Sequence, residues 1–310
     1  MNVCVLGLWH LGSVTSACLS SVGHKVTGLD FDLNLINDLN NGKAPIFEPG
    51  LNNLLERGIY KKNLLFTSKI DEATKDCDVL WVTYDTPVDK DDCADFQYVI
   101  KQVQLVLPFL KEKSTILVSS QMPVGSIKDL ELFAKNNFPK HDFGFAYSPE
   151  NLRLGNALEV FLNPDRIVIG FRSNYDQIKI KELLNPITDN LVFMSIESAE
   201  MTKHAINAFL ATSVTFANEI AIICELVGAD AKEVEKGLKT EQRIGPKAYL
   251  SPGAAFSGGT LARDITFLAK IANNKSLTLP LIKSIKESNN EHKNWVKKRL
   301  LKKFTNLSGI

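Results

Sequence analysis

The chain has 310 residues, about twice the length of a typical domain of ~150 residues, so one large or two medium-sized domains are expected. Hydrophobic residues make up 45% and charged residues 23%, which excludes a disordered or fibrous protein. With 36 basic and 35 acidic residues, the net charge of +1 offers no basic excess for nucleic acid or an anionic membrane. Five unclustered cysteines predict reduced thiols in the cytoplasm rather than a disulfide framework: Cys4, Cys18, Cys77, Cys93 and Cys224.

The first half of the sequence alternates short apolar runs with segments that suit helices. Residues 2–6 predict a strand, residues 7–12 a turn and residues 13–22 a helix. Further strands are predicted at residues 26–29, 64–67, 79–83, 115–119 and 143–146. Because these runs are apolar throughout rather than alternating, they predict a parallel sheet covered on both faces. We therefore expect a doubly wound α/β domain whose core ends near residues 146–150.

From about residue 196 the pattern becomes helical. Residues 198–227 predict one long helix with apolar residues on most faces, and helices follow at residues 231–238, 261–271 and 281–304. The expected fold is thus a Rossmann domain over residues 1–195 (a core over 1–150 plus an extension) and a mainly α-helical dimerisation domain over 196–310. The even apolar surface of the long helix is covered most simply by a second copy, so we expect a homodimer. No stretch of about 18 uncharged apolar residues predicts a membrane span.

A possible nucleotide-binding turn follows the first strand. Gly7, four residues, Gly12 and then a helix place backbone N–H groups at a helix N-terminus, which suits a pyrophosphate. Trp9 occupies the middle glycine of the usual GxGxxG motif, so a tight turn without ligand is the alternative. Asp30 closes the second strand, where a carboxylate suits a ribose diol and repels a 2′-phosphate. The sequence predicts NAD rather than NADP.

Two polar residues on the long predicted helix could act on a substrate. Lys203 and Asn207 are four residues apart and project from one face, where a buried pair could hold a developing oxyanion; a solvated lysine is the alternative. His204 points to a different helix face, which predicts a structural role. The five histidines show no metal-ligand spacing, and no Cys/His cluster indicates a metal site.

Six segments of the chain form a recognisable series. They are GLDFDLNLINDLNNGKAPIFEPGLNNLL (28–55), DTP (85–87), SPENLRLGNALEVFLNPDRIVIG (148–170), AEMTKHAINAFLATSVTFANEIAIICE (199–225), TEQRIG (240–245) and SPGAAFSGGTLARD (251–264). This series resembles the nucleotide-sugar 6-dehydrogenases, the UDP-glucose and UDP-N-acetylmannosamine/GDP-mannose dehydrogenase family. The resemblance covers nearly the whole chain and implies a Rossmann domain, a long-helix dimerisation domain and a C-terminal nucleotide-binding domain. We expect this last domain to be absent here.

The resemblance implies NAD-dependent oxidation of a nucleotide sugar, as in a UDP-glucose 6-dehydrogenase, carrying a primary alcohol toward an aldehyde or uronic acid. It assigns catalysis to Lys203, Asn207, Asp264, Glu150 and Thr260. It places at the cofactor Gly7, Trp9, His10, Leu11, Gly12, Asp30, Thr86, Ser120, Gln121 and Glu150. It places at the substrate Asn151, Leu152, Arg153, Lys203, Asn207, Arg243, Phe256 and Gly258. Arg243 matches an arginine that, in dimers of this family, extends across the interface to the substrate bound by the other subunit.

Three departures from the family pattern change the expected chemistry. Thr260 in FSGGTLARD replaces the nucleophilic cysteine, Leu154 replaces a glutamate, and Gln121 replaces a threonine. A threonine hydroxyl is a poor nucleophile without an adjacent base, so we expect no covalent thiol catalysis.

Three functions remain compatible with these residues. The first is a nucleotide-sugar dehydrogenase limited to one oxidation, or using water or Thr260 for the second. The others are a two-electron 3-hydroxyacid or sugar-acid dehydrogenase and a non-catalytic NAD-binding relative. Retention of Asp30, Lys203, Asn207 and Asp264 favours the first.

Overall fold

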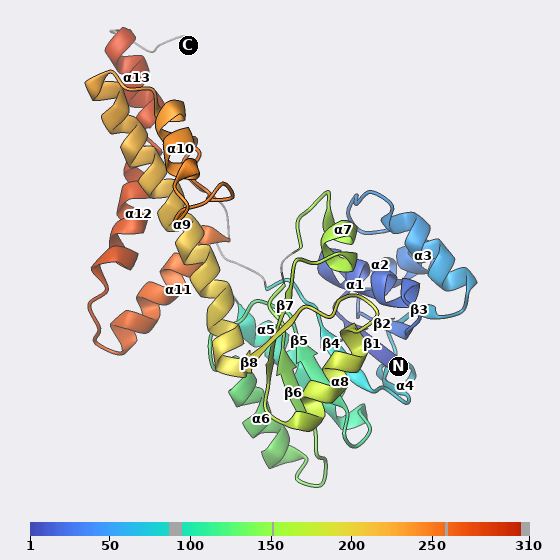
Figure 1. Ribbon diagram of the computed structural model, residues 1–310. Coiled ribbons are helices and arrows are strands. Elements are labelled where there is room, and N and C mark those ends of the chain that lie inside the picture. The colour runs from blue at the N-terminus through green and yellow to red at the C-terminus, as the bar shows by residue number, and fades with distance from the viewer. Residues whose placement is uncertain (87–94, 151, 258–259, 305–310) are drawn as a thin grey trace. The chain divides into compact units, whose positions relative to one another are not determined.

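The computed structural model describes residues 1–86, 95–150, 152–257 and 260–304 (Figure 1). These residues form two compact units that divide within one long helix. The first unit holds residues 1–86 and 95–202, and the second holds residues 203–304.

The first unit is built on an eight-stranded sheet. Its strands are β1 (Asn2–Leu6), β2 (Lys25–Leu29), β3 (Leu64–Thr67), β4 (Val79–Val82), β5 (Thr115–Val118), β6 (Gly144–Tyr147), β7 (Ile167–Phe171) and β8 (Leu191–Ser195). Their order across the sheet is β3-β2-β1-β4-β5-β6-β7-β8, and neighbouring strands pair in parallel except β6 with β7. This topology confirms the predicted doubly wound α/β class.

Helices cover both faces of this sheet (Figure 1). They are α1 (His10–Ser21), α2 (Leu33–Asn40), α3 (Leu51–Tyr60), α4 (Ile70–Thr74), α5 (Phe96–Val106), α6 (Ser126–Asn137), α7 (Ala157–Leu162) and α8 (Asn174–Leu184), with a 3₁₀ turn at Leu107–Phe109. On β1, Val3 and Val5 pack under α1, α2 and α3, whereas Cys4 and Leu6 pack under α5 and α6. Burial on both faces explains why β1 is apolar from Val3 to Leu6.

The sheet extends further than predicted. We expected its core to end near residues 146–150, but β7 and β8 add two strands beyond β6. Every residue of β8 is half-buried or exposed, as befits an edge strand, so its hydropathy gives a weak signal. The antiparallel pairing of β7 with β6 also departs from the all-parallel sheet that was predicted.

The second unit is helical. It contains the long helix α9 (Ile196–Val227) from residue 203 onward, followed by α10 (Ala231–Thr240), α11 (Leu261–Asn274), α12 (Pro280–His292) and α13 (Trp295–Lys303). Its small core joins Ala208 and Ala211 of α9 to Ile265 of α11 and Ile285 of α12. The single helix predicted over residues 281–304 is wrong, because the chain leaves the helix between His292 and Trp295. The segment SNNEHKN there is rich in asparagine, which has low helix propensity.

By length and composition, α9 is the one helix of the described chain that could cross a membrane. This is weak evidence, because the core helix of a soluble protein has the same length and composition.

Candidate functional site

The turn between β1 and α1 is too tight for a side chain at either of its glycines. Gly7 has φ +91°, a conformation that L side chains rarely adopt, and a Cβ on Gly12 would lie 1.8 Å from the carbonyl oxygen of Gly7. Both positions therefore require glycine. Trp9, the N-cap of α1, makes no side-chain capping bond and is 51% exposed, and the first turn of α1 carries no acid. The helix N-terminus is thus suited to an anion such as a pyrophosphate.

Asp30 stands at the end of β2, beside this turn. Its Oδ2 accepts a hydrogen bond from the Leu8 N–H at 2.8 Å, and its Oδ1 accepts one from the Asp32 N–H at 3.1 Å. The carboxylate is therefore fixed in place while remaining half-buried, with lone pairs left for further donors. A ribose diol could supply those donors.

The loops after β4 and β5 meet near the same end of the sheet. The hydroxyl of Thr86 donates to the carbonyl of Gln121 at 2.6 Å, joining two predicted cofactor residues. The hydroxyls of Tyr84 and Ser120 are buried and have no hydrogen-bond partner in the described chain. Buried hydroxyls are normally paired, so this end of the sheet holds unused hydrogen-bonding capacity.

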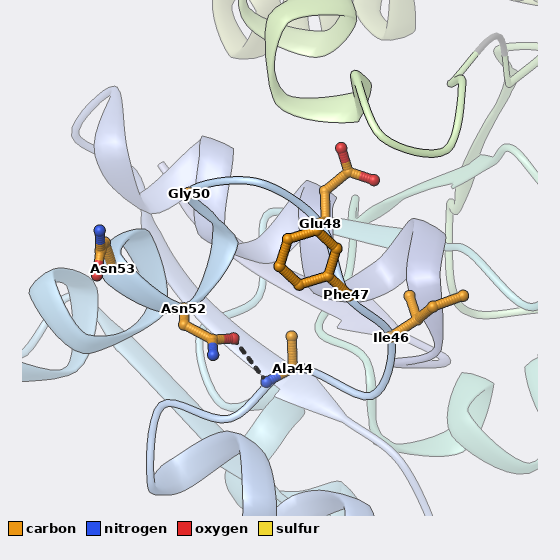
Figure 2. Close-up of a pocket in the computed structure, with 7 residues that line it drawn as sticks. All are labelled: Ala44, Ile46, Phe47, Glu48, Gly50, Asn52 and Asn53. Atoms are coloured by element: carbon orange, nitrogen blue, oxygen red, sulfur yellow. Dashed lines mark hydrogen bonds between the residues drawn. The ribbon is translucent and has the colours of Figure 1, made fainter.

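Glu48 ties three segments of the first unit together. It lies in the loop between α2 and α3, which carries a pocket, and Figure 2 shows its carboxylate turned away from Asn52, toward the segment before α7. It accepts hydrogen bonds from the backbone N–H groups of Gly155 at 2.9 Å and Ala157 at 2.8 Å, and contacts Nε2 of His10 at 3.0 Å. The nucleotide turn and the segment that follows the SPENLR residues are therefore both anchored to one buried carboxylate.

The predicted substrate residues of the first unit follow β6. Glu150 and Leu152 are half-buried, and Leu152 packs against the core under α1. Arg153 is exposed, and its carbonyl accepts the Asn156 N–H at 3.0 Å. Asn151 lies outside the described residues. The roles of these residues stay predictions.

The second unit holds a buried polar cluster between α9 and α11. Asp264, in the first turn of α11, is fully buried. Its Oδ1 lies 2.9 Å from Nδ1 of His204, and its Oδ2 accepts a hydrogen bond from the Asn207 amide. The His204 ring stacks on Phe267 with centroids 4.4 Å apart. The structure thus brings Asp264 and Asn207 together, with half-buried Lys203 next to His204 on α9.

Three other predicted residues lie in this unit. Thr260 is the exposed N-cap residue of α11 and makes no side-chain capping bond. The backbone of Phe256 is fixed by Asn289, whose Oδ1 accepts its N–H and whose amide donates to its carbonyl, each at 2.9 Å. Arg243 is exposed and its Nε donates to Glu241 at 3.0 Å. Gly258 lies outside the described residues.

The described cysteines are unsuited to nucleophilic catalysis. Cys4, Cys18, Cys77 and Cys224 are all buried. Burial raises the pKa of the Cys18 and Cys77 thiols to about 12 and also raises that of Cys4, which disfavours the reactive thiolates. Cys93 lies outside the described residues. No group of His, Cys, Asp and Glu residues that could hold a metal ion is found among the described residues.

Sequence reasoning missed three residues of these sites. Glu48 stands in the family-like string APIFEPG, which was a usable signal, although two of its three partners lie more than a hundred residues away. His204 was assigned a structural role, yet it contacts the predicted catalytic acid Asp264. Nothing in the sequence distinguished Tyr84 from an ordinary core residue at the end of a strand.

Models of one protein family match most of the chain. The NAD-binding domain of the UDP-glucose/GDP-mannose dehydrogenase family matches residues 1–188, and the central domain of the same family matches residues 197–291. The UDP-glucose 6-dehydrogenase TuaD of Bacillus subtilis is 34% identical over 309 residues, which are 99% of this chain and 67% of that protein.

Solved structures agree with these matches. A UDP-glucose dehydrogenase from Pyrobaculum islandicum superposes with a TM-score of 0.87 at 28% identity, covering 94% of this chain and 68% of that one. A GDP-mannose dehydrogenase from Pseudomonas aeruginosa gives a TM-score of 0.74 at 30% identity, covering 94% and 69%. A 3-hydroxyisobutyrate dehydrogenase from Mycobacterium tuberculosis, at 16% identity, shares the fold alone, with a TM-score of 0.67 and 94% and 92% covered.

Proposed function

The chain belongs to the UDP-glucose/GDP-mannose dehydrogenase family, and from this premise we propose that it oxidises the primary alcohol of a nucleotide sugar with NAD. The observation that carries the proposal is the buried cluster in which Asp264 accepts the Asn207 amide, because it unites two residues that the resemblance assigns to the chemistry. The 3-hydroxyacid alternative has only a shared fold in its support.

The residues of the first unit fit NAD. The two glycines allow the tight turn from β1 into α1, whose N-terminus suits a pyrophosphate, and Asp30 is fixed with spare acceptor capacity for a ribose. The unpartnered hydroxyls of Tyr84 and Ser120 are further groups that a bound dinucleotide could satisfy. When bound, NAD supplies the acceptor for the hydride.

The residues of the second unit supply proton transfer and oxygen stabilisation. Asp264 and Lys203 would assist removal of the hydroxyl proton, and the Asn207 amide would steady the substrate oxygen as charge develops. The Asp264 carboxylate is fully buried, so it is shielded from water, and His204 and Asn207 hold it in one orientation. The resemblance also assigns Glu150, which is half-buried after β6, to the chemistry.

Thr260 supports a reaction without an enzyme thioester. It heads α11 where the family carries its nucleophilic cysteine, and the described cysteines are buried. An aldehyde would therefore be released, or hydrated in place and oxidised again.

The deciding experiment counts NADH formed per UDP-glucose and per related nucleotide sugars by the full-length protein, with mass spectrometry for an enzyme adduct. One NADH with free aldehyde supports a two-electron enzyme, and two NADH without adduct support the hydrate route. A trapped acyl adduct on any cysteine contradicts the thiol-free chemistry, and Cys93→Ala identifies whether that residue carries it. Absence of NADH with every nucleotide sugar favours the non-catalytic relative.

We also propose that the protein is a cytoplasmic homodimer joined through α9. Phe209, Phe216 and Ile223 recur every seven residues on one side of this helix and are 71%, 45% and 53% exposed in the described unit. An exposed apolar stripe of this length favours a symmetric partner. Light scattering should give twice the monomer mass at micromolar concentration, and Phe216→Asp should shift it toward the monomer, whereas a monomer mass for the unmodified protein would exclude the dimer.

A further inference from the structure

Tyr84 is a buried polar residue for which the fold alone gives no reason. It follows β4, is 8% exposed and packs in the core beneath α5. Its hydroxyl has no hydrogen-bond partner in the described chain. A phenylalanine would fill the same space without burying an unpaired hydroxyl, which costs stability in the ligand-free protein. The hydroxyl therefore points to a partner that arrives with a ligand.

The position of Tyr84 identifies where that ligand lies. Leu6 of β1 is in register with Leu29 of β2 and Val82 of β4, so Gly7, Asp30 and the residues after Val82 occupy neighbouring positions at one edge of the sheet. The Tyr84 ring lies against the nucleotide turn, because a Cβ on Gly7 would stand 2.7 Å from two of its atoms. Ligands of parallel α/β sheets bind at this carboxyl edge.

The surroundings of the hydroxyl tie it to Asp30. Burial raises the pKa of Tyr84, and the negative charge of Asp30 raises it further. The same two causes raise the pKa of Tyr98, whose ring meets Tyr84 edge to face with centroids 5.5 Å apart. Both phenols thus lie within the electrostatic influence of the carboxylate that the proposed function assigns to a ribose.

We propose that the Tyr84 hydroxyl binds the same ribose as Asp30, in the adenosine half of the dinucleotide. The inference rests on the proposed NAD site. The Asp30 carboxylate has acceptors only. It can accept hydrogen bonds from the two ribose hydroxyls but cannot donate one to a ribose oxygen. The phenol O–H supplies that missing donor. Tyr84 is then a cofactor-binding residue. Its hydroxyl lowers the stability of the ligand-free protein and raises the affinity for NAD.

Both effects of the hydroxyl, on stability and on NAD affinity, are tested with Tyr84→Phe, which removes one oxygen and keeps the ring. In full-length protein, calorimetry should show NAD binding weakened about two- to tenfold, as loss of one neutral hydrogen bond predicts. Thermal unfolding without nucleotide should show a melting temperature equal to or above that of the unmodified protein. Tyr60→Phe, which makes the same change at a side chain that is 88% exposed at the end of α3, serves as the matched control.

Binding of fragments locates the contact. ADP-ribose and 5′-AMP both carry the adenosine ribose, so Tyr84→Phe should weaken them by the same factor as NAD. Weakening of NAD alone would place the contact in the nicotinamide half and overturn the assignment, as would unchanged NAD affinity or a lower melting temperature of the free variant. If the unmodified protein binds no NAD, the proposed function itself fails; if it binds NAD and the variant binds equally well, only this inference fails.

Discussion

Removing the Glu48 carboxylate should destabilise the first unit strongly. The side chain is buried and receives two backbone N–H groups, from Gly155 and Ala157, in addition to its contact with His10. Glu48→Ala leaves these donors without an acceptor in a buried place, a loss that typically costs about 3–5 kcal/mol. This is a large share of the roughly 5–15 kcal/mol that stabilises an ordinary domain. For a domain of this size the melting temperature should fall by about 6–20 °C.

Two further variants separate the charge from the space it fills. Glu48→Gln keeps the shape and one acceptor oxygen, so its loss should be smaller, about 1–3 kcal/mol. Glu56→Gln, on the exposed surface of α3, makes the same chemical change and should stay within about 0.5 kcal/mol. Urea denaturation followed by circular dichroism measures each difference. Equal stabilities of Glu48→Gln and Glu56→Gln would refute the anchoring role.

The stabilising effect of the Glu48 carboxylate should depend on pH in a predictable direction. Burial by itself would raise the pKa of Glu48, but the N–H groups of Ala157 and Gly155 and the nearby His10 outweigh it, so the pKa lies below its ordinary value. A depressed carboxyl pKa contributes stability that is complete above the unfolded value of about 4.3 and is lost as the pH falls through the lower folded value. The advantage of the unmodified protein over Glu48→Gln should therefore shrink below about pH 4. A difference that grows on acidification would contradict this assignment.

Substitutions at three other positions test the two sites. Asp30→Ala should weaken NAD binding by about 1–3 kcal/mol in calorimetric titration, and equal affinity of the unmodified protein for NAD and NADP would refute the ribose assignment. His204→Phe keeps the ring stack on Phe267 but loses the bond to Asp264, so kcat should fall about tenfold or more. His204→Asn, which retains a donor near Nδ1, should recover most of it; full activity of His204→Phe together with a loss in His204→Asn would mean that only packing matters. Thr260→Cys should introduce a trappable thioester and raise the NADH yield of a protein that stops after one oxidation; absence of any adduct would show that α11 does not present this position to the substrate.

Local patterns predicted the first six strands because each is a short apolar run bounded by turns or helix-compatible segments. The parallel register followed from the absence of alternation, and burial of Val3 and Val5 on one face and Cys4 and Leu6 on the other shows why. In the extension beyond β6, the edge strand β8 is only partly buried and gives a weak signal, whereas β7 is a buried apolar run that local patterns could have identified. Hydrophobic periodicity in a sequence reflects which side chains are buried, so a strand with few buried side chains gives only a weak pattern.

The candidate site was predictable only where its residues are close in sequence. The four-residue spacing of Lys203 and Asn207 places both on one side of α9, and the glycines of the turn are local as well. The partnership of Asp264 with His204 joins two helices across sixty residues, and no sequence pattern encodes which face of α9 meets α11. The unpaired hydroxyl of Tyr84 is likewise a property of the folded chain.

The change at Thr260 bears on the second half of the reaction rather than on the first. A thiol is partly ionised near neutral pH and can capture an aldehyde, whereas a threonine hydroxyl needs a base within hydrogen-bond reach. Asp264, one turn further along α11, directs its carboxylate to His204 and Asn207 on α9, whereas the Thr260 side chain is exposed at the start of α11 and makes no capping bond. Hydration of the aldehyde avoids the difficulty, because the resulting geminal diol is again an alcohol with a C–H bond at the same carbon. In the proposed reaction, the groups that would remove a proton and steady an oxygen in the first oxidation would also serve the second, without a nucleophile on α11.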